Sequence, residues 1–386
     1  MYDCIVVGAG PGGSTAASKL AKANLKVLVL EKQALPRYKV CGGAVSGRAA
    51  EMINADLAKV TEDVINKVDV RWAKSHEPPV RHTSEIPIAY LVMRQKFDNL
   101  LAEQALHHGA HIHDGEEVKE LNFYDDLVEV KTDFSTYKTK TVIGADGALG
   151  ITARQSGLYV PRSKGVALEI EAAVDDSVLE QWRKTVLISF GAPEHGYAWV
   201  FPKANHLSIG IGRFATQSQN LLDKLKTFTE PLNINWRREQ VKAHPIPLGG
   251  IKRDFSRPHF VLVGDAANLC DPLSGEGIAY AIESGSLAAN SVLNAFSTGD
   301  FTMADYQQHI EQKINRHLKI ARQLAGMFYT LPSTFFKLFC SNRQLLAWYF
   351  DTIKGEKNYG DVWALVKSVI QPHHFASRKK RDKIYR

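Results

Sequence analysis

The chain has 386 residues, of which 45% are hydrophobic and 23% are charged, and its formal net charge is +7. These fractions are average for globular proteins, so they exclude a wholly disordered or fibrous chain, and the length allows one large domain or two ordinary ones. The four cysteines are scattered and form no CxxC pair, which argues against a disulfide scaffold and a metal site. We therefore expect no bound metal and a reducing, cytoplasmic compartment.

The positive charge is concentrated at the C-terminal end. Residues 378–386 contain six basic side chains and one acidic one, so five of the seven net charges lie there. The nearly neutral remainder argues against a nucleic-acid partner. Two interpretations of the tail remain open. It is either a solvated terminus or a peripheral anchor to an anionic membrane face, to which each basic residue would contribute about 1 kcal/mol.

The N-terminal segment predicts a compact βαβ unit. An apolar strand over residues 2–8 is followed by a glycine turn, a helix over 12–23 and a second buried strand over 26–30. Because the first strand begins directly after Met1, we expect no cleavable signal peptide. No window of about 18 apolar residues predicts a membrane-spanning helix.

The middle of the chain reads as a mixture of elements. Residues 94–108 carry a helical apolar stripe, and a β-meander follows it. Alternating strands between turn residues then indicate an antiparallel sheet in a second domain. The strands expected in these two regions are 118–123, 127–130 and 137–143, and then 166–174, 185–190, 197–201 and 207–212.

The last third begins with another buried strand and then becomes helical. We expect a strand over 259–264 and a helix of small residues over 275–296. The aromatic region beyond residue 301 is expected to be helical. It would either cover a lipid tunnel, contact a bilayer, or form an ordinary helical core.

The turn after the first strand carries a dinucleotide fingerprint. It reads Gly8-Ala9-Gly10-Pro11-Gly12-Gly13, and Glu31 follows 23 residues after Gly8. The glycines permit a tight turn, close approach of the backbone to a pyrophosphate, and close packing of helix on strand. The helix N-terminus favours phosphate, and Glu31 is placed to bind ribose hydroxyls. We assign to this site Gly8, Gly10, Pro11, Gly12, Gly13, Glu31, Lys32 and Arg37.

A second glycine-acid strand end distinguishes FAD from NAD. The run Gly264-Asp265-Ala266-Ala267 leads through a proline-glycine loop into a helix, which resembles flavoproteins of the para-hydroxybenzoate hydroxylase type. The resemblance implies that FAD is the cofactor, with this aspartate near the ribitol and pyrophosphate. It also implies that the loop amides lie at the isoalloxazine edge, where a helix N-terminus favours negative charge. The residues implicated here are Gly264, Asp265, Pro272, Gly275, Gly277 and Ile278.

Two further segments fit the same family. Met93-Arg94 followed by Phe97-Asp98 resembles an element whose arginine contacts the cofactor, which implicates Arg94. Gly144-Ala145-Asp146-Gly147 resembles the DG element of flavin hydroxylases, which implicates Asp146. Arg154 lies one residue later than in that element and Gly150 replaces its serine, so an NADPH contact there is not inferred.

The segment Cys41-Gly42-Gly43 and the segment Tyr197-Ala198-Trp199-Val200-Phe201-Pro202 together resemble the FAD-dependent geranylgeranyl reductase family. That family reduces carbon–carbon double bonds of long isoprenoid chains. The resemblance implies an isoprenoid or prenylated lipid substrate and NADPH or a ferredoxin-like protein as electron donor.

The aromatic motif has a physical rationale for such a substrate. On a strand, Tyr197, Trp199 and Phe201 share one face and would form an apolar wall, with Pro202 beside it. The same alternation could instead face an interdomain core. Cys41, Gly42 and Gly43 are the candidate catalytic segment, since small residues there would let substrate approach the flavin. Cys41 could influence which double bond is reached or donate a proton, and it could equally be a buried small hydrophobe. No histidine or acid is identified as the proton donor.

The fold expected is α/β (α+β), with a Rossmann-type FAD-binding domain interleaved with an antiparallel-sheet substrate domain and a helical C-terminal region. We expect the FAD-binding domain in 1–75, 90–160 and 250–300, and the substrate domain in 76–89 and 161–249. The helical region and the basic tail then occupy 301–376 and 377–386.

Two other functions remain open from the sequence. One is a flavin-dependent monooxygenase or halogenase, against which Asn268 replaces the histidine common after the GDAA run. The other is a flavin-bearing lipid-binding or electron-transfer protein that performs no reaction on the lipid.

Overall fold

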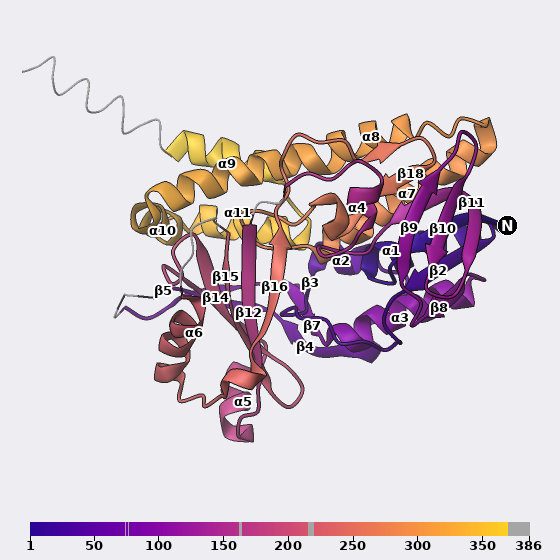
Figure 1. The fold of residues 1–386 in the computed structure, drawn as a ribbon. Helices are drawn as coiled ribbons and strands as arrows, with labels where there is room; N and C mark the ends of the chain where they lie inside the picture. Colours follow the sequence, from indigo (N-terminus) through magenta and orange to yellow (C-terminus); the bar gives the residue numbers. More distant parts are fainter. Residues whose placement is uncertain (74, 76, 162–163, 215–219, 370–386) are drawn as a thin grey trace, which may run out of the picture.

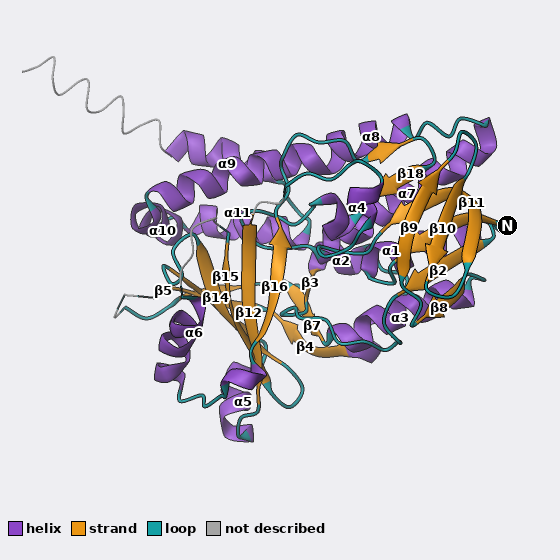
Figure 2. Ribbon diagram, viewed as in Figure 1, coloured by secondary structure: helices purple, strands orange, loops and turns teal. Residues whose placement is uncertain are grey.

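The computed structural model describes residues 1–369 except 74, 76, 162–163 and 215–219, so the predicted basic tail lies outside the described residues. The strands in the described part form a mostly parallel sheet, a mostly antiparallel sheet and a small sheet between them (Figures 1 and 2). Helices α8 to α11 run along one side of the molecule.

The first sheet has the predicted βαβ unit at its centre. Its order is β17-β18-β11-β1-β2-β8, and β1 pairs in parallel with both β11 and β2. The hairpin β9–β10 extends from β11. The strands are β1 (Tyr2–Val7), β2 (Val27–Glu31), β8 (His111–Asp114), β9 (Val118–Phe123), β10 (Val128–Thr132), β11 (Thr136–Gly144), β17 (Ser256–Arg257) and β18 (Phe260–Leu262).

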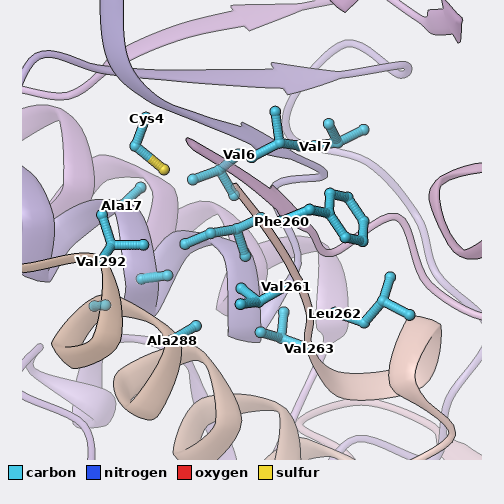
Figure 3. Packing of buried hydrophobic residues seen from close by; sticks show 14 of the residues in the cluster. Cys4, Val6, Val7, Ala17, Phe260, Val261, Leu262, Val263, Ala288 and Val292 are labelled. Carbon is cyan, nitrogen blue, oxygen red and sulfur yellow. The ribbon is translucent and has the colours of Figure 1, made fainter. Parts of the chain in front are cut away.

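The main core lies where this sheet meets helices α1 (Pro11–Lys22) and α7 (Ile278–Thr298). Figure 3 shows the apolar side chains of β1 and β18 meeting small residues of both helices, including Ala17, Ala288 and Val292. Small side chains let the two helices approach closely. A Cβ at Gly285 would lie 2.2 Å from the carbonyl oxygen of Gly12. Helix α3 (Arg94–His107) also packs against α1.

The second sheet has the order β16-β12-β15-β14-β13-β5-β6 and is antiparallel except for the parallel pair β5–β13. Helices α5 (Asp176–Trp182) and α6 (Leu221–Thr229) cover one face through Leu179, Leu225 and Phe228. The strands are β5 (Lys67–Trp72), β6 (Val80–Thr83), β12 (Lys164–Ala172), β13 (Thr185–Phe190), β14 (Gly196–Pro202), β15 (Leu207–Arg213) and β16 (Lys242–Pro247).

The remaining elements connect the two large sheets. A three-stranded sheet contains β3 (Ala44–Ser46), β7 (Ala89–Val92) and β4 (Thr61–Ile65), and α2 (Gly47–Glu51) follows β3. The C-terminal helices are α8 (Ala304–Ile310), α9 (Arg316–Thr330), α10 (Pro332–Ser341) and α11 (Arg343–Lys354), with a π-helical turn at Glu311–Asn315. Within the described ranges we find no helix with the length and apolar character needed to cross a bilayer.

The fold class is confirmed, and the differences from expectation are local. Residues 67–72 were expected among the FAD-binding segments, but this strand pairs with β13 in the second sheet. The sequence pattern could not predict this pairing, because the two strands lie more than 100 residues apart in the chain. The strand expected over 259–264 ends at Leu262, and Gly264–Ala267 forms a 3₁₀ turn. The following helix begins at Ile278 rather than 275, and residues 275–277 form a loop that lines the cavity described below.

The close contact of α1 with α7 generates a stability prediction. Gly285→Ala forces the new Cβ onto the Gly12 carbonyl, and we expect it to lower the free energy of unfolding by about 1–3 kcal/mol. Gly326→Ala is the control, because no atom lies within 4 Å of its Cβ position on helix α9. It should raise stability by about 0.5–1 kcal/mol. Urea denaturation measures the free energy of unfolding of both variants. Equal changes in the two variants would contradict the close contact of α1 with α7.

Candidate functional site

A cavity of about 580 Å³ runs from the nucleotide turn to the face of the second sheet opposite α5 and α6. Its lining includes most of the residues predicted from the motifs. These are Gly8, Gly10, Pro11, Gly12, Glu31, Lys32, Arg37, Cys41, Gly42, Gly43, Arg94, Asp146, Tyr197, Trp199, Phe201, Gly264, Asp265, Gly275, Gly277 and Ile278.

Three predicted residues do not line the cavity. Gly13 packs on the turn, where its Cβ would lie 2.0 Å from the Gly8 carbonyl oxygen. Pro202 shares its strand face with Ala198 and Val200, which contact the core under α5 and α6. Pro272 belongs to the loop before α7 but its side chain is not part of the lining. These residues can shape the site only indirectly.

The nucleotide end has the geometry expected of a pyrophosphate cradle. Gly8 has a φ of 106°, and a Cβ there would lie 2.4 Å from the Ala145 carbonyl oxygen. At Gly10, by contrast, the only neighbour within 4 Å of a Cβ would be Arg37 Nη2 at 3.7 Å. The space over the N-terminus of α1 is therefore open for an anionic group.

Acidic and basic side chains fix the ribose side of this cradle. Glu31 Oε2 accepts a hydrogen bond from Ala9 N at 2.9 Å and faces Arg37 Nε at 3.2 Å. Arg37 also contacts Asp98, and Asp98 holds Arg94 through two bonds of 2.7 and 2.8 Å. Asp98 is fully buried and orients both arginines. Arg94 is thereby fixed at the cavity wall.

Asp146 is held by the start of helix α4 (Thr152–Gln155). Its carboxylate accepts hydrogen bonds from the Thr152 backbone N at 2.8 Å and hydroxyl at 2.5 Å. Burial raises the pKa of Asp146. A Cβ at Gly150 would lie 1.9 Å from this carboxyl carbon, which explains why glycine replaces the serine of the hydroxylase element.

Charged side chains of both signs meet at the cavity beside the Gly264–Ala267 turn. Asp265 lies 3.9 Å from Lys39 Nζ, which donates to His244 Nε2 at 3.1 Å. Burial and this ammonium lower the pKa of His244 to about 4, so the imidazole is neutral at pH 7. Asp271 Oδ1 accepts from the backbone N of Leu273 and Ser274, which shapes the loop leading into α7.

The aromatic motif forms the predicted wall at the far side of the cavity. The Trp199 ring lies 6.1 Å from both the Tyr197 and Phe201 rings. It lies so close to β15 that a Cβ at Gly210 would be 2.0 Å from the indole. The Tyr197 hydroxyl donates to the Ser274 carbonyl oxygen and ties the wall to the loop before α7. The wall therefore borders both the cavity and the junction between the two sheets.

The Cys41–Gly43 segment lies directly on this wall. A Cβ at Gly42 would lie 2.9 Å from the Phe201 ring and 3.1 Å from Trp199 Nε1. Gly43 has a φ of 64° and could not carry a Cβ, which would lie 2.0 Å from the Val92 carbonyl oxygen. Cys41 is half-buried and accepts a bond from the Gly43 N at 3.4 Å. The glycines are thus required by close packing.

Two charged residues at this junction were missed from the sequence. Lys203 is fully buried and donates to the carbonyl oxygens of Gly42 at 2.8 Å and Val92 at 2.9 Å. Burial lowers its pKa. Glu169 of β12 also lines the cavity and is 1% exposed. Glu169 could have been predicted, because it is an acidic residue at an inward-facing position of a strand. No feature of the sequence indicated a role for Lys203.

The apolar end of the cavity is enclosed by four elements. Val68 and Val70 of β5, and Val186, Ile188 and Phe190 of β13, contribute one wall. Helices α10 and α11 contribute the other, so the aromatic C-terminal region covers part of the cavity. The helix residues in the lining are Phe339, Tyr349, Phe350 and Ile353.

Comparisons with known proteins agree with this geometry. The model of the FAD binding domain family matches residues 1–300. Digeranylgeranylglycerophospholipid reductase of Thermoplasma acidophilum is 31% identical over 84% of this chain and 88% of that protein. Menaquinone reductase of Mycolicibacterium smegmatis is 29% identical over 86% of this chain and 85% of that protein. A solved geranylgeranyl bacteriochlorophyll reductase-like protein from T. acidophilum superposes with a TM-score of 0.74 at 28% identity, covering 84% and 88% of the two chains.

The fold, the two-ended cavity and the matched domain define an FAD-dependent oxidoreductase. The open cradle at Gly10 and the fixed acid at Glu31 fit this cofactor. The chain belongs to the FAD-dependent geranylgeranyl reductase family.

The open space at Gly10 gives a direct test of the cofactor site. The φ of Gly10 is −77°, which any residue adopts, so Gly10→Val should fold while its side chain fills the cradle. We expect FAD affinity to fall at least about tenfold, or about 1.4 kcal/mol. Flavin fluorescence titration of the apoprotein measures it, with Gly326→Ala as the control. Unchanged FAD affinity would mean that the pyrophosphate binds elsewhere.

Proposed function

We propose that this protein reduces carbon–carbon double bonds of a long-chain isoprenoid substrate with electrons from its FAD. The observation that carries the proposal is the continuity of the cavity from the nucleotide turn to an apolar end. The Cys41–Gly43 segment and the aromatic wall lie where the two ends meet.

The apolar end suits a substrate that offers no hydrogen bonds. A polyprenyl chain is recognised by shape and by buried apolar area, at roughly 25 cal/mol per Å². The side chains of β5, β13, α10 and α11 that face this end are aliphatic or aromatic. The two named relatives act on a geranylgeranyl lipid and on menaquinone, which both carry polyprenyl chains.

When bound and reduced, FAD would supply the hydride for one alkene carbon, and the other carbon would need a proton. The protein's contribution is placement and exclusion of water. Gly42 and Gly43 leave no side chain between the loop and the wall, while Lys203 fixes the two carbonyl groups behind them. Cys41 and Arg94 border the same part of the cavity. These residues hold the substrate chain against the cofactor site.

Two partners stay predictions from the sequence. NADPH or a ferredoxin-like protein would reduce the flavin, and the basic tail over 377–386 would hold the protein at an anionic membrane face, close to a water-insoluble substrate.

The test is mass spectrometry of prenyl lipids incubated anaerobically with the dithionite-reduced holoprotein. We expect a gain of two hydrogens per reduced double bond in at least one of geranylgeranyl diphosphate, a geranylgeranylated glycerolipid or menaquinone. A hydroxylated or halogenated product that requires oxygen would instead support a monooxygenase or halogenase. Binding without any mass change would support a non-catalytic lipid carrier.

The apolar end also predicts chain-length selectivity. Val70→Phe adds volume at a buried position of the lining, where overpacking costs about 1–3 kcal/mol. We expect reduction of geranylgeranyl substrates to fall at least about tenfold while geranyl substrates retain activity. Leu106→Phe, on the exposed face of α3, is the control. Equal loss for both chain lengths would show that the chain does not extend to β5.

A further inference from the structure

Strand β12 places two carboxyl groups on the face that borders the cavity. Glu169 and Glu171 alternate with Leu168 and Ile170, which contact the core under α6 on the opposite face. Glu169 is 1% exposed, and its Oε1 accepts a hydrogen bond from Cys41 N at 3.3 Å. Its Oε2 has no hydrogen-bond partner among the residues that the structure describes. A buried carboxyl group thus lines the cavity beside Cys41, and it forms no ion pair with any residue that the structure describes.

The Lys203 ammonium does not neutralise the Glu169 carboxyl group. Lys203 Nζ is engaged with the carbonyl oxygens of Gly42 and Val92 and forms no ion pair with Glu169 within the described part of the chain. A buried carboxylate without a partner is costly, so the neutral acid is favoured. Burial and the Glu171 charge raise the pKa of Glu169 to about 8, against the smaller opposing effect of Lys203 and the Cys41 amide. Glu169 therefore holds a proton at neutral pH.

Tyr38, a further titratable group that faces Glu169, is also protonated. The Tyr38 hydroxyl lies close to it, and burial and the two carboxyls raise the pKa of this phenol. The groups that face Glu169 from packed elements are therefore Glu171 of the same strand, Lys203 after β14, and Tyr38 and Cys41 of the loop before β3. Lys203 is the cation among them.

A polar route connects Glu169 to the surface. The side chain of Glu171 is 26% exposed and lies 2.8 Å from His206 Nε2, and the His206 side chain is 17% exposed. Ser208 pairs with Glu171 across β15 and carries a buried hydroxyl without a partner among the described residues. Partly exposed groups that can exchange protons with solvent therefore lie two strand positions from Glu169.

We propose that Glu169 is the proton donor of the alkene reduction and is reprotonated through Glu171 and His206. The proposal rests on the proposed function. The hydride from reduced FAD, carrying two electrons, forms a C–H bond at one alkene carbon as the π bond breaks. The O–H bond of Glu169 breaks and its proton forms the second C–H bond. FAD is left oxidised, the alkene reduced, and the Glu169 carboxylate recovers a proton from solvent.

Glu169→Gln is the main test, because the amide keeps the shape and the acceptor for Cys41 N but donates no comparable acid proton. FAD content and reduction by dithionite should match the wild type. Oxidation of the reduced flavin by a prenyl substrate, followed anaerobically by absorbance, should slow at least about 100-fold. Glu180→Gln, on the exposed side of α5, is the matched control and should not change the rate.

The pH profile separates proton donation from a structural role. Because the acid form is lost as pH rises through the folded-state pKa, the wild-type rate should fall about tenfold per pH unit above about 8. This high-pH limb of the profile, in which the rate falls, should be absent in Glu169→Gln. Glu171→Gln removes the neighbouring charge that raises the pKa of Glu169, so its limb should move to lower pH. An unmoved limb in both variants would overturn the proposal.

Infrared spectroscopy of the holoprotein supplies a readout that does not depend on turnover. The wild type should show the carbonyl stretch of a protonated carboxyl at neutral pH, and Glu169→Gln should lack it. A missing band in the wild type, or a Glu169→Gln enzyme as fast as the wild type, overturns the role of Glu169 alone. A wild type that shows the band but reduces no prenyl lipid overturns the proposed function.

Discussion

The architecture of the site depends on one buried ammonium group. Lys203 Nζ binds the carbonyl oxygens of Gly42 and Val92, and so joins the end of β14 to the Cys41–Gly43 loop and to β7. Burying a charge is costly unless dipoles or counter-ions surround it, and here two carbonyl groups and the Glu171 carboxyl of β12 offset the burial that lowers the pKa of Lys203. Because the loop is fixed at this point, the nucleotide end and the aromatic wall share one cavity.

The two helix N-termini at the cofactor end depend on a second constraint, which is the absence of side chains. Gly12 and Gly285 let α1 and α7 approach until backbone atoms touch, and Gly8 lets the first turn close against Ala145. Gly42 and Gly210 do the same around Trp199, and Gly43 does so at the Val92 carbonyl oxygen. The glycines of both ends therefore have one physical function, which is to bring backbone and flat rings into contact where a Cβ would not fit.

An element or contact could be predicted from the sequence when the interacting residues lie close together in the chain. The first βαβ unit depends on local periodicity and on glycine spacing, so its strands and helix were predicted to within a residue or two. The parallel pairing of β5 with β13 joins segments more than 100 residues apart, and no local pattern reports it. The same limit applies to Lys203, whose partners come from two distant segments.

The candidate site shows the same division. Motifs predicted the glycine turns, Glu31, Arg94 and the aromatic wall, because each of these depends on a short run of consecutive residues. Glu169 was missed although it occupies an inward strand position, because its meaning depends on burial and on the lack of a partner, which only the folded chain shows. Pro202 was included from its motif and lies on the opposite strand face, since strand residues alternate.

The central claim is that electrons pass from FAD to a prenyl chain held in the apolar end of one cavity. Anaerobic stopped-flow absorbance of the reduced holoprotein mixed with a geranylgeranyl lipid tests it most directly. The account predicts recovery of the oxidised flavin spectrum at a rate that rises with lipid concentration, and no recovery with the fully saturated lipid. A flavin that stays reduced with every unsaturated prenyl lipid would contradict it.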